Sequence, residues 1–134
     1  MDIASILRRR GGAIPLVAPT ASIATVVGIL SSRRLGAVLV TDAGQVLGIV
    51  SERDIIHSLA TVGAASLEMT AGQLMTRALR TATPDTSLPE AMRIMAEGRF
   101  RHLPVFDGAT LCGLISLSDV AEARALEESG ALAA

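Results

Sequence analysis

The chain contains 134 residues, and its 12 basic and 13 acidic residues leave a formal net charge of −1. Such a balanced chain has no strong field of either sign, which argues against binding to nucleic acid or to an acidic membrane surface. Hydrophobic residues make up 50% of the chain and aromatic residues only 1%, and no apolar run approaches the roughly 18 residues of a membrane span. The core must therefore be aliphatic, in a domain of ordinary size.

The first residues, MDIASILRRR, predict a short helix that ends in a basic turn, Arg8–Arg10. Gly11 and Gly12 are expected to stop it. The charges follow the apolar residues, which is not the layout of a secretory signal peptide, so we expect a cytoplasmic protein. The single cysteine, Cys112, excludes an intrachain disulfide and is expected to be a small buried hydrophobe.

The next segment predicts strand, helix, strand, strand and helix in turn. A short strand is expected over 14–18, and a helix follows Ser22, with Pro19 just upstream. Its apolar stripe has helical spacing: Ile23, Val26, Val27 and Leu30. Strands are expected over 36–41 and 46–50, joined by the turn DAGQ, and a further helix begins at Ser51.

After a connection over 63–70, the same series is predicted again. A strand over 79–83 leads to a helix capped by Thr86 or Ser87, with Glu90 placed as in a capping box. The apolar stripe of this helix is Leu88, Ala91, Met92 and Met95. Strands over 102–106 and 111–115 follow, then a helix that begins at Ser116. The tail, 129–134, is expected to be frayed.

The two halves are copies of one unit at a constant offset of 65 residues. Pro84 matches Pro19, Ser87 matches Ser22, Gly113 matches Gly48 and Asp119 matches Asp54, without a gap. A unit of about 60 residues buries little surface alone, so the copies should pack together. We predict an α+β fold of two tandem β-α-β-β-α repeats about a pseudo-twofold axis, with repeats at 1–66 and 67–134 in one globular module.

Two phrases carry a family resemblance. GIVSERDI at 48–55 and GLISLSDV at 113–120 share the pattern Gly, two aliphatic residues, Ser, two variable residues, Asp and an aliphatic residue. Together with RHLPV at 101–105, they resemble a tandem pair of CBS domains, a Bateman module, in the form of a small stand-alone bacterial protein. The resemblance covers residues 1–126.

This resemblance implies a regulatory module that binds an adenosine-containing ligand in clefts between the repeats. AMP, ADP, ATP, NAD(H) and S-adenosylmethionine are the candidates, with AMP, ATP and NAD expected first, as a regulatory ligand and not a catalytic cofactor. Asp54 and Asp119 would hold the ribose hydroxyls. Ser51 and Ser116 would meet the ribose or the phosphate.

The same resemblance suggests where the phosphate and adenine would lie. Arg53 lies beside the phosphate position of the first copy, where the second copy has Ser118, so the two clefts should differ. The second copy could draw on Arg99, Arg101 or His102. The adenine would be held by segments that begin a repeat or its second strand: Ile14, Pro15, Leu16, Val17, Gly36, Ala37 and Val38 in one copy, and Thr81, Ala82, Thr83, Leu103 and Pro104 in the other.

Simpler interpretations stay open. Ser-x-x-Asp before an apolar run is also a helix cap, and His102 could be only a polar residue at a strand start. A ligand-free interaction or stress-response scaffold is therefore the alternative function. No catalytic constellation, metal-ligand spacing or glycine-rich phosphate loop is present, so we expect neither an enzyme nor a metal site.

The last helix of each copy also predicts a partner. Its apolar residues Ile55, Ile56, Leu59 and Val120 exceed what one module should expose. We expect a homodimer that buries these faces and signals through its geometry, with an unidentified protein target as a further partner.

Overall fold

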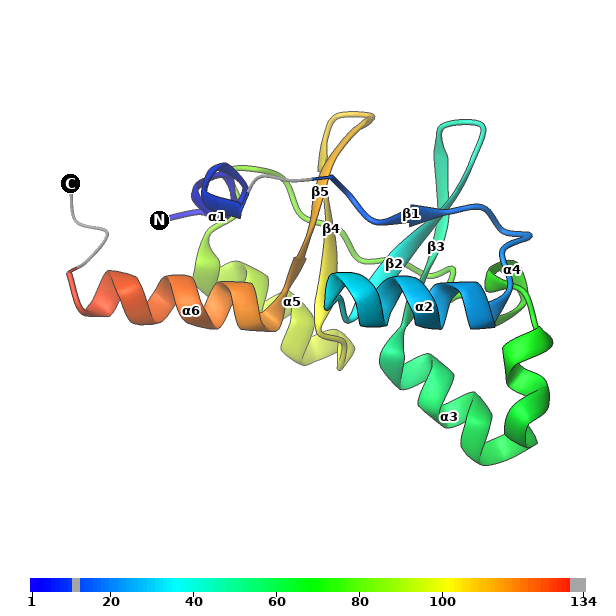
Figure 1. The fold of residues 1–134 in the computed structure, drawn as a ribbon. Coiled ribbons are helices and arrows are strands. Elements are labelled where there is room, and N and C mark those ends of the chain that lie inside the picture. The colour runs from blue at the N-terminus through cyan, green and yellow to red at the C-terminus, as the bar shows by residue number, and fades with distance from the viewer. Residues whose placement is uncertain (11–12, 131–134) are drawn as a thin grey trace. The chain divides into compact units, whose positions relative to one another are not determined.

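The computed structural model describes residues 1–10 and 13–130, which form two compact units (Figure 1). The contiguous unit is Pro15–Leu79, and the composite unit joins Met1–Ile14 to the segment from Arg80 onward. Each unit combines helices with a small sheet, which confirms the α+β class. The predicted glycine stop at 11–12 and the tail beyond Gly130 lie outside the described residues.

The contiguous unit has a three-stranded sheet in the order β1-β2-β3. β1 runs parallel to β2, and β2 is antiparallel to β3. Its elements in chain order are β1 Leu16–Val17, α2 Ile23–Arg33, β2 Ala37–Asp42, β3 Gln45–Ser51, α3 Glu52–Val62, the 3-10 helix η1 Gly63–Glu68 and α4 Ala71–Leu74. The predicted connection over 63–70 is thus mostly helical, and η1 is held to α3 by the buried hydroxyls of Ser58 and Ser66, 2.7 Å apart.

The composite unit has a two-stranded antiparallel sheet of β4 and β5. Its elements are α1 Ile3–Arg10, α5 Leu88–Gly98, β4 His102–Asp107, β5 Thr110–Ser116 and α6 Leu117–Glu128. The predicted N-terminal helix with its basic last turn is confirmed as α1. Cys112 is half-buried and packs against the core of this unit.

The backbone repeats as closely as the sequence does. A β-bulge falls between Val40 and Thr41 in one hairpin and between Val105 and Phe106 in the other, 65 residues apart. The predicted helix caps also agree, because Ser22 accepts from the amide of Thr25 and Ser87 from that of Glu90. Since bulges and caps depend on local geometry, the offset reflects a repeated structure and not only a repeated composition.

The first strand differs between the units, and a proline accounts for the difference. In the contiguous unit, the amide of Leu39 donates to the carbonyl of Pro15 at 2.9 Å, which ties β1 to β2. Pro104 holds the equivalent place in β4 and has no amide hydrogen to donate. The strand predicted over 79–83 is therefore wrong in extent: only an isolated bridge between Ala82 and Val105 forms there.

α1 and α4 play equivalent parts in the two units. The amide of Ile3 donates to Thr86 at 3.0 Å, and that of Ala71 donates to Ala21 at 2.8 Å. Asp2 and Thr70, 68 residues apart, cap the two helices. The helix that begins the chain thus completes the unit of the second copy. The predicted repeats, 1–66 and 67–134, describe the sequence copies and stay a prediction.

Each unit has its own aliphatic core, as the composition predicts. Two predicted stripe residues do not belong to these cores. Val27 is 37% exposed, because it lies on the outer side of α2, and Met92 is only half-buried. On α5, Ile94 takes the inner position and is 7% exposed.

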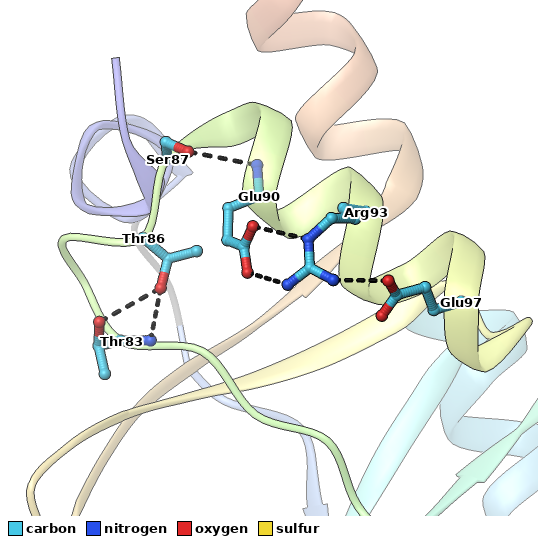
Figure 2. Close-up of polar contacts among 6 residues, drawn as sticks. All are labelled: Thr83, Thr86, Ser87, Glu90, Arg93 and Glu97. Carbon is cyan, nitrogen blue, oxygen red and sulfur yellow. Dashed lines mark hydrogen bonds and ion pairs between the residues drawn. The ribbon is translucent and has the colours of Figure 1, made fainter.

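The capping box predicted at Ser87 is only half formed. Ser87 caps the amide of Glu90, but the Glu90 carboxylate turns to the guanidinium of Arg93, which also contacts Glu97 (Figure 2). A charged partner one turn along the helix competes better for the carboxylate than the backbone amide of the cap. The hydrogen bond from Arg93 lowers the pKa of Glu90.

Candidate functional site

The first Ser-x-x-Asp turn joins β3 to α3 and forms a complete capping box. The Ser51 amide donates to Asp54 Oδ2 at 2.8 Å, and the Ser51 hydroxyl donates to the same oxygen at 2.9 Å. In return, the Asp54 amide donates to Ser51 Oγ at 3.2 Å. Every one of these bonds to the carboxylate ends on Oδ2.

The adenine candidates of the contiguous unit lie beside this turn. Ala37 pairs with Ser51 across the hairpin, and the Glu52 amide donates to the Gly36 carbonyl at 2.9 Å. The start of β2 therefore lies next to the start of α3. Pro15 is brought to the same strand by its bond to Leu39.

Burial limits what these candidates could offer a ligand. Ala37 and Val38 are 1% and 0% exposed, and Val17 belongs to the core, so these residues offer little accessible surface to a ligand. Leu16 is 47% exposed. Ile14 belongs to the composite unit, so the structure does not group it with the others.

The second Ser-x-x-Asp turn, between β5 and α6, has the same capping box with a different second donor. The Ser116 amide donates to Asp119 Oδ2 at 2.7 Å, and the Asp119 amide donates to Ser116 Oγ at 3.1 Å. The Arg10 guanidinium donates to that same Oδ2, also at 3.1 Å. The carboxylate of this turn thus forms an ion pair with α1.

The neighbours of this second turn follow the pattern of the first. His102 pairs with Ser116, and the Leu117 amide donates to the Arg101 carbonyl at 2.8 Å. Of the adenine candidates, Leu103 and Ala82 are core side chains at 0% and 5% exposure.

The remaining adenine candidates of this unit differ in exposure. Pro104 is buried, whereas Thr81 and Thr83 are exposed. Thr83 is held in a turn by Thr86, whose hydroxyl accepts from the Thr83 amide at 3.0 Å (Figure 2).

The predicted phosphate contacts lie at the edges of these turns. Arg53 is exposed in the first turn of α3, and Ser118 is exposed in the first turn of α6. Arg101 is exposed just before β4, whose first residue is the half-buried His102. Arg99 ends α5 in the left-handed conformation with φ 57°.

Two arginines were not among the predicted site residues. Arg34 ends α2 with φ 54°, at the place equivalent to Arg99, and the 65-residue offset could have revealed it. Arg10 could not have been found this way. It is 109 residues from Asp119, and the sequence indicated only a basic helix end.

The predicted dimer face needs a correction. Ile55 and Val120 are 5% and 0% exposed and belong to the cores of their own units. Each follows the capping aspartate by one residue, so it lies on the side of the helix that packs on the sheet. Ile56 and Leu59 are exposed, at 65% and 38%.

Residues 1–10 and 13–130 are the part of the chain that the structure describes. No group of three or more His, Cys, Asp or Glu residues in this part of the chain could hold a metal ion. No helix in it is long and apolar enough to cross a membrane.

Two repeated units with matching caps and bulges, each with a Ser-x-x-Asp turn after its hairpin, define a tandem-repeat module. The chain matches the CBS domain family twice, over residues 2–61 and 71–126. It therefore belongs to the CBS domain family, as a tandem pair.

The solved structures agree with this assignment. A CBS-domain containing protein from Agrobacterium tumefaciens is 40% identical, with a TM-score of 0.89 over 92% of this chain and 99% of that chain. The CBS domain pair of protein MJ0100, in complex with 5′-methylthioadenosine and S-adenosyl-L-methionine, is 21% identical, with a TM-score of 0.83 over 95% of this chain and 98% of that one.

Curated relatives are longer than this chain. The mitochondrial CBS domain-containing protein CBSX3 of Arabidopsis thaliana is 32% identical over 99 residues, which are 70% of this chain and 48% of the relative. The human 5′-AMP-activated protein kinase subunit gamma-3 is 33% identical over 125 residues, 87% of this chain and 26% of that protein. The chain spans about half of the first relative and a quarter of the second.

Proposed function

We propose that this chain is a regulatory module that binds an adenosine-containing ligand through the Ser-x-x-Asp turns of its two units. The observation that carries the proposal is the arrangement at Asp54: a capping carboxylate at a helix start, beside the first residues of strand β2. Asp119 has the same arrangement in the other unit. AMP, ATP and NAD are the ligands we would test first.

The chemistry of the turn suits a ribose. A carboxylate can accept hydrogen bonds from two neighbouring hydroxyls. Among the described residues, the capping bonds of Asp54 use Oδ2, which leaves Oδ1 as an acceptor. The dipole of an 11-residue helix favours a phosphate nearby, and Arg53 lies in the first turn of that helix.

The names of two related proteins support the choice of ligand. The name of the kinase subunit gamma-3 refers to 5′-AMP, and the MJ0100 structure contains two adenosyl compounds. We extend that chemistry to this chain because its two Ser-x-x-Asp turns provide the same kind of group twice. Signalling would pass through a homodimer, with Ile56 and Leu59 in its interface.

Isothermal titration against AMP, ADP, ATP, NAD, NADH and S-adenosylmethionine tests the proposal. We expect Asp54→Asn and Asp119→Asn each to weaken binding at one site at least tenfold, since charge-assisted hydrogen bonds to the ribose are lost. Glu52→Gln and Glu122→Gln are matched controls, because both acids are exposed in the first two turns of the same helices and take no part in the capping boxes.

A ligand-free scaffold is the second candidate, and the capping boxes favour it. Both aspartates already have a structural role, which would explain them without any ligand. A folded protein that binds none of the six compounds would support the scaffold and contradict the proposed sensor. Equal binding by the aspartate variants and the wild type would show that the ligand lies elsewhere.

A further inference from the structure

We infer that Arg10 is a competing cation at the second site: it contacts Oδ2 of Asp119, and a ribose whose hydroxyls use both oxygens of this carboxylate must displace it. This inference rests on the proposed function. It adds that the second site is regulated by the N-terminal helix.

The contact has two anchors. Arg10 Nη1 donates to Asp119 Oδ2 at 3.1 Å and to the main-chain carbonyl of Leu114 at 2.7 Å. Leu114 lies in β5, two residues before the Ser-x-x-Asp turn. The side chains of Arg10 and Asp119 are 39% and 22% exposed, so the ion pair is at the surface and can be reached by a ligand.

The contiguous unit has a main-chain hydrogen bond at the place where the composite unit has the contact from Arg10 to Leu114. Ile49 is the equivalent of Leu114, and its carbonyl accepts from the main-chain amide of Thr76 at 2.8 Å. α4 stops at Leu74, so the chain is already extended there and bridges β3 with its backbone. The donors to the Asp54 carboxylate that the structure gives are the amide and the hydroxyl of Ser51.

The carboxylates of Asp54 and Asp119 therefore have different hydrogen-bond donors before a ligand binds. At Asp54 the second donor to Oδ2 is the hydroxyl of Ser51. At Asp119 it is Arg10, and no bond from the Ser116 hydroxyl to the carboxylate is formed. A neutral ribose at Asp119 gives up part of its binding energy because it must replace a charged donor. When it does so, the end of α1 loses its ion pair.

Adenosine is the appropriate probe because it has the ribose hydroxyls and no phosphate. In the full chain with Asp54→Asn, the titration measures adenosine binding at the second site alone. We expect Arg10→Gln in that background to tighten adenosine binding about two- to fivefold, the range of a surface ion pair. Arg9→Gln is the matched control, since it removes a neighbouring exposed arginine of α1. Added salt should strengthen adenosine binding only where Arg10 is present.

Hydrogen exchange gives a second measurement. Saturating adenosine should speed exchange in the last turn of α1, and Arg10→Gln should do so without ligand. Unchanged or weaker adenosine binding in the Arg10 variant would overturn the inference and leave the proposed function intact. If adenosine binds neither variant, the second site and the competing cation are both wrong, while binding at Asp54 can still be judged from the titrations above.

Discussion

The two units are copies that reach similar folds by different bonds. The contiguous unit closes its sheet with main-chain hydrogen bonds, from Leu39 to Pro15 on one side and between Ile49 and Thr76 on the other. The composite unit keeps two main-chain bonds between Ala82 and β4, but it has Pro104 at the first of these places and the Arg10 side chain at the second. Main-chain bonds hardly depend on the side chain, whereas a guanidinium can be displaced or mutated. The composite unit is thus the more easily altered of the two.

The largest effect on stability is expected when Leu39 of the contiguous unit is replaced by proline, the residue that the composite unit has at the equivalent position. Leu39 is 0% exposed, so Leu39→Ala should cost about 2–5 kcal/mol of unfolding free energy. Leu39→Pro should cost about 1–3 kcal/mol more, because the Pro15 carbonyl loses its donor. Denaturant unfolding of both variants measures the difference. Equal losses would mean that the bond to β1 contributes nothing.

Replacing Gly48 and Gly113, the equivalent glycines of the two hairpins, by alanine should cost unequal amounts of stability. A Cβ at Gly48 would lie 2.7 Å from the Thr76 carbonyl oxygen, which belongs to the backbone. A Cβ at Gly113 would lie 2.7 Å from Leu7 Cδ2, the end of a flexible side chain. We expect Gly48→Ala to cost about 2–3 kcal/mol and Gly113→Ala less than about 1 kcal/mol. Thermal unfolding of the pair checks this, and the reverse order would show that α1 is the more rigid cover.

Substitutions at equivalent positions of the two hairpin turns should change stability in opposite directions. Ala43 has φ 51° and Gly108, its equivalent, has φ 61°. Ala43→Gly should stabilise the protein by up to about 1 kcal/mol, and Gly108→Ala should destabilise it by about as much, because the left-handed region strains a side chain. Chemical denaturation would show both shifts. A loss of stability in Ala43→Gly would mean that the entropy of the unfolded chain decides instead.

The smallest effect concerns Glu90, whose pKa is lowered in the folded state by Arg93. A carboxyl with a lowered folded pKa stabilises the protein above its unfolded pKa, and this is lost as pH falls through the folded value. Glu90→Gln should therefore lower the melting temperature slightly at neutral pH, and this difference should shrink as the pH falls through the folded pKa of Glu90. A difference that persists in acid would indicate a helix-propensity effect.

Much of the fold could be predicted because its signals are local. The 65-residue offset, the caps at Ser22 and Ser87 and the turns after the hairpins depend on residues close in the chain. The strand predicted over 79–83 is wrong in extent although Pro104 is visible in the sequence, because the residue that pairs with a strand cannot be read from the sequence. The prediction that Ile55 and Val120 lie in a dimer interface is wrong because apolar residues occur on both faces at the start of the helix, and the sequence does not show which face packs on the sheet.

The candidate site was predicted by resemblance and local pattern, and both aspartates do lie in equivalent turns. The sequence could not show which groups donate hydrogen bonds to each carboxylate. The partner of Asp119 comes from the other end of the chain, and no spacing rule connects residues 109 positions apart.

The exchange of leading helices also sets an order of assembly during synthesis. The buried core cluster of the contiguous unit lies between Val17 and Ala71, so this unit can close as soon as its own segment has left the ribosome. α1 is made before that unit but contributes Ile3 and Ile6 to a core that includes Ala123. The apolar face of α1 therefore stays uncovered until α6 has been translated. During that interval it is the segment most open to chaperones or to the unfinished unit of a neighbouring chain.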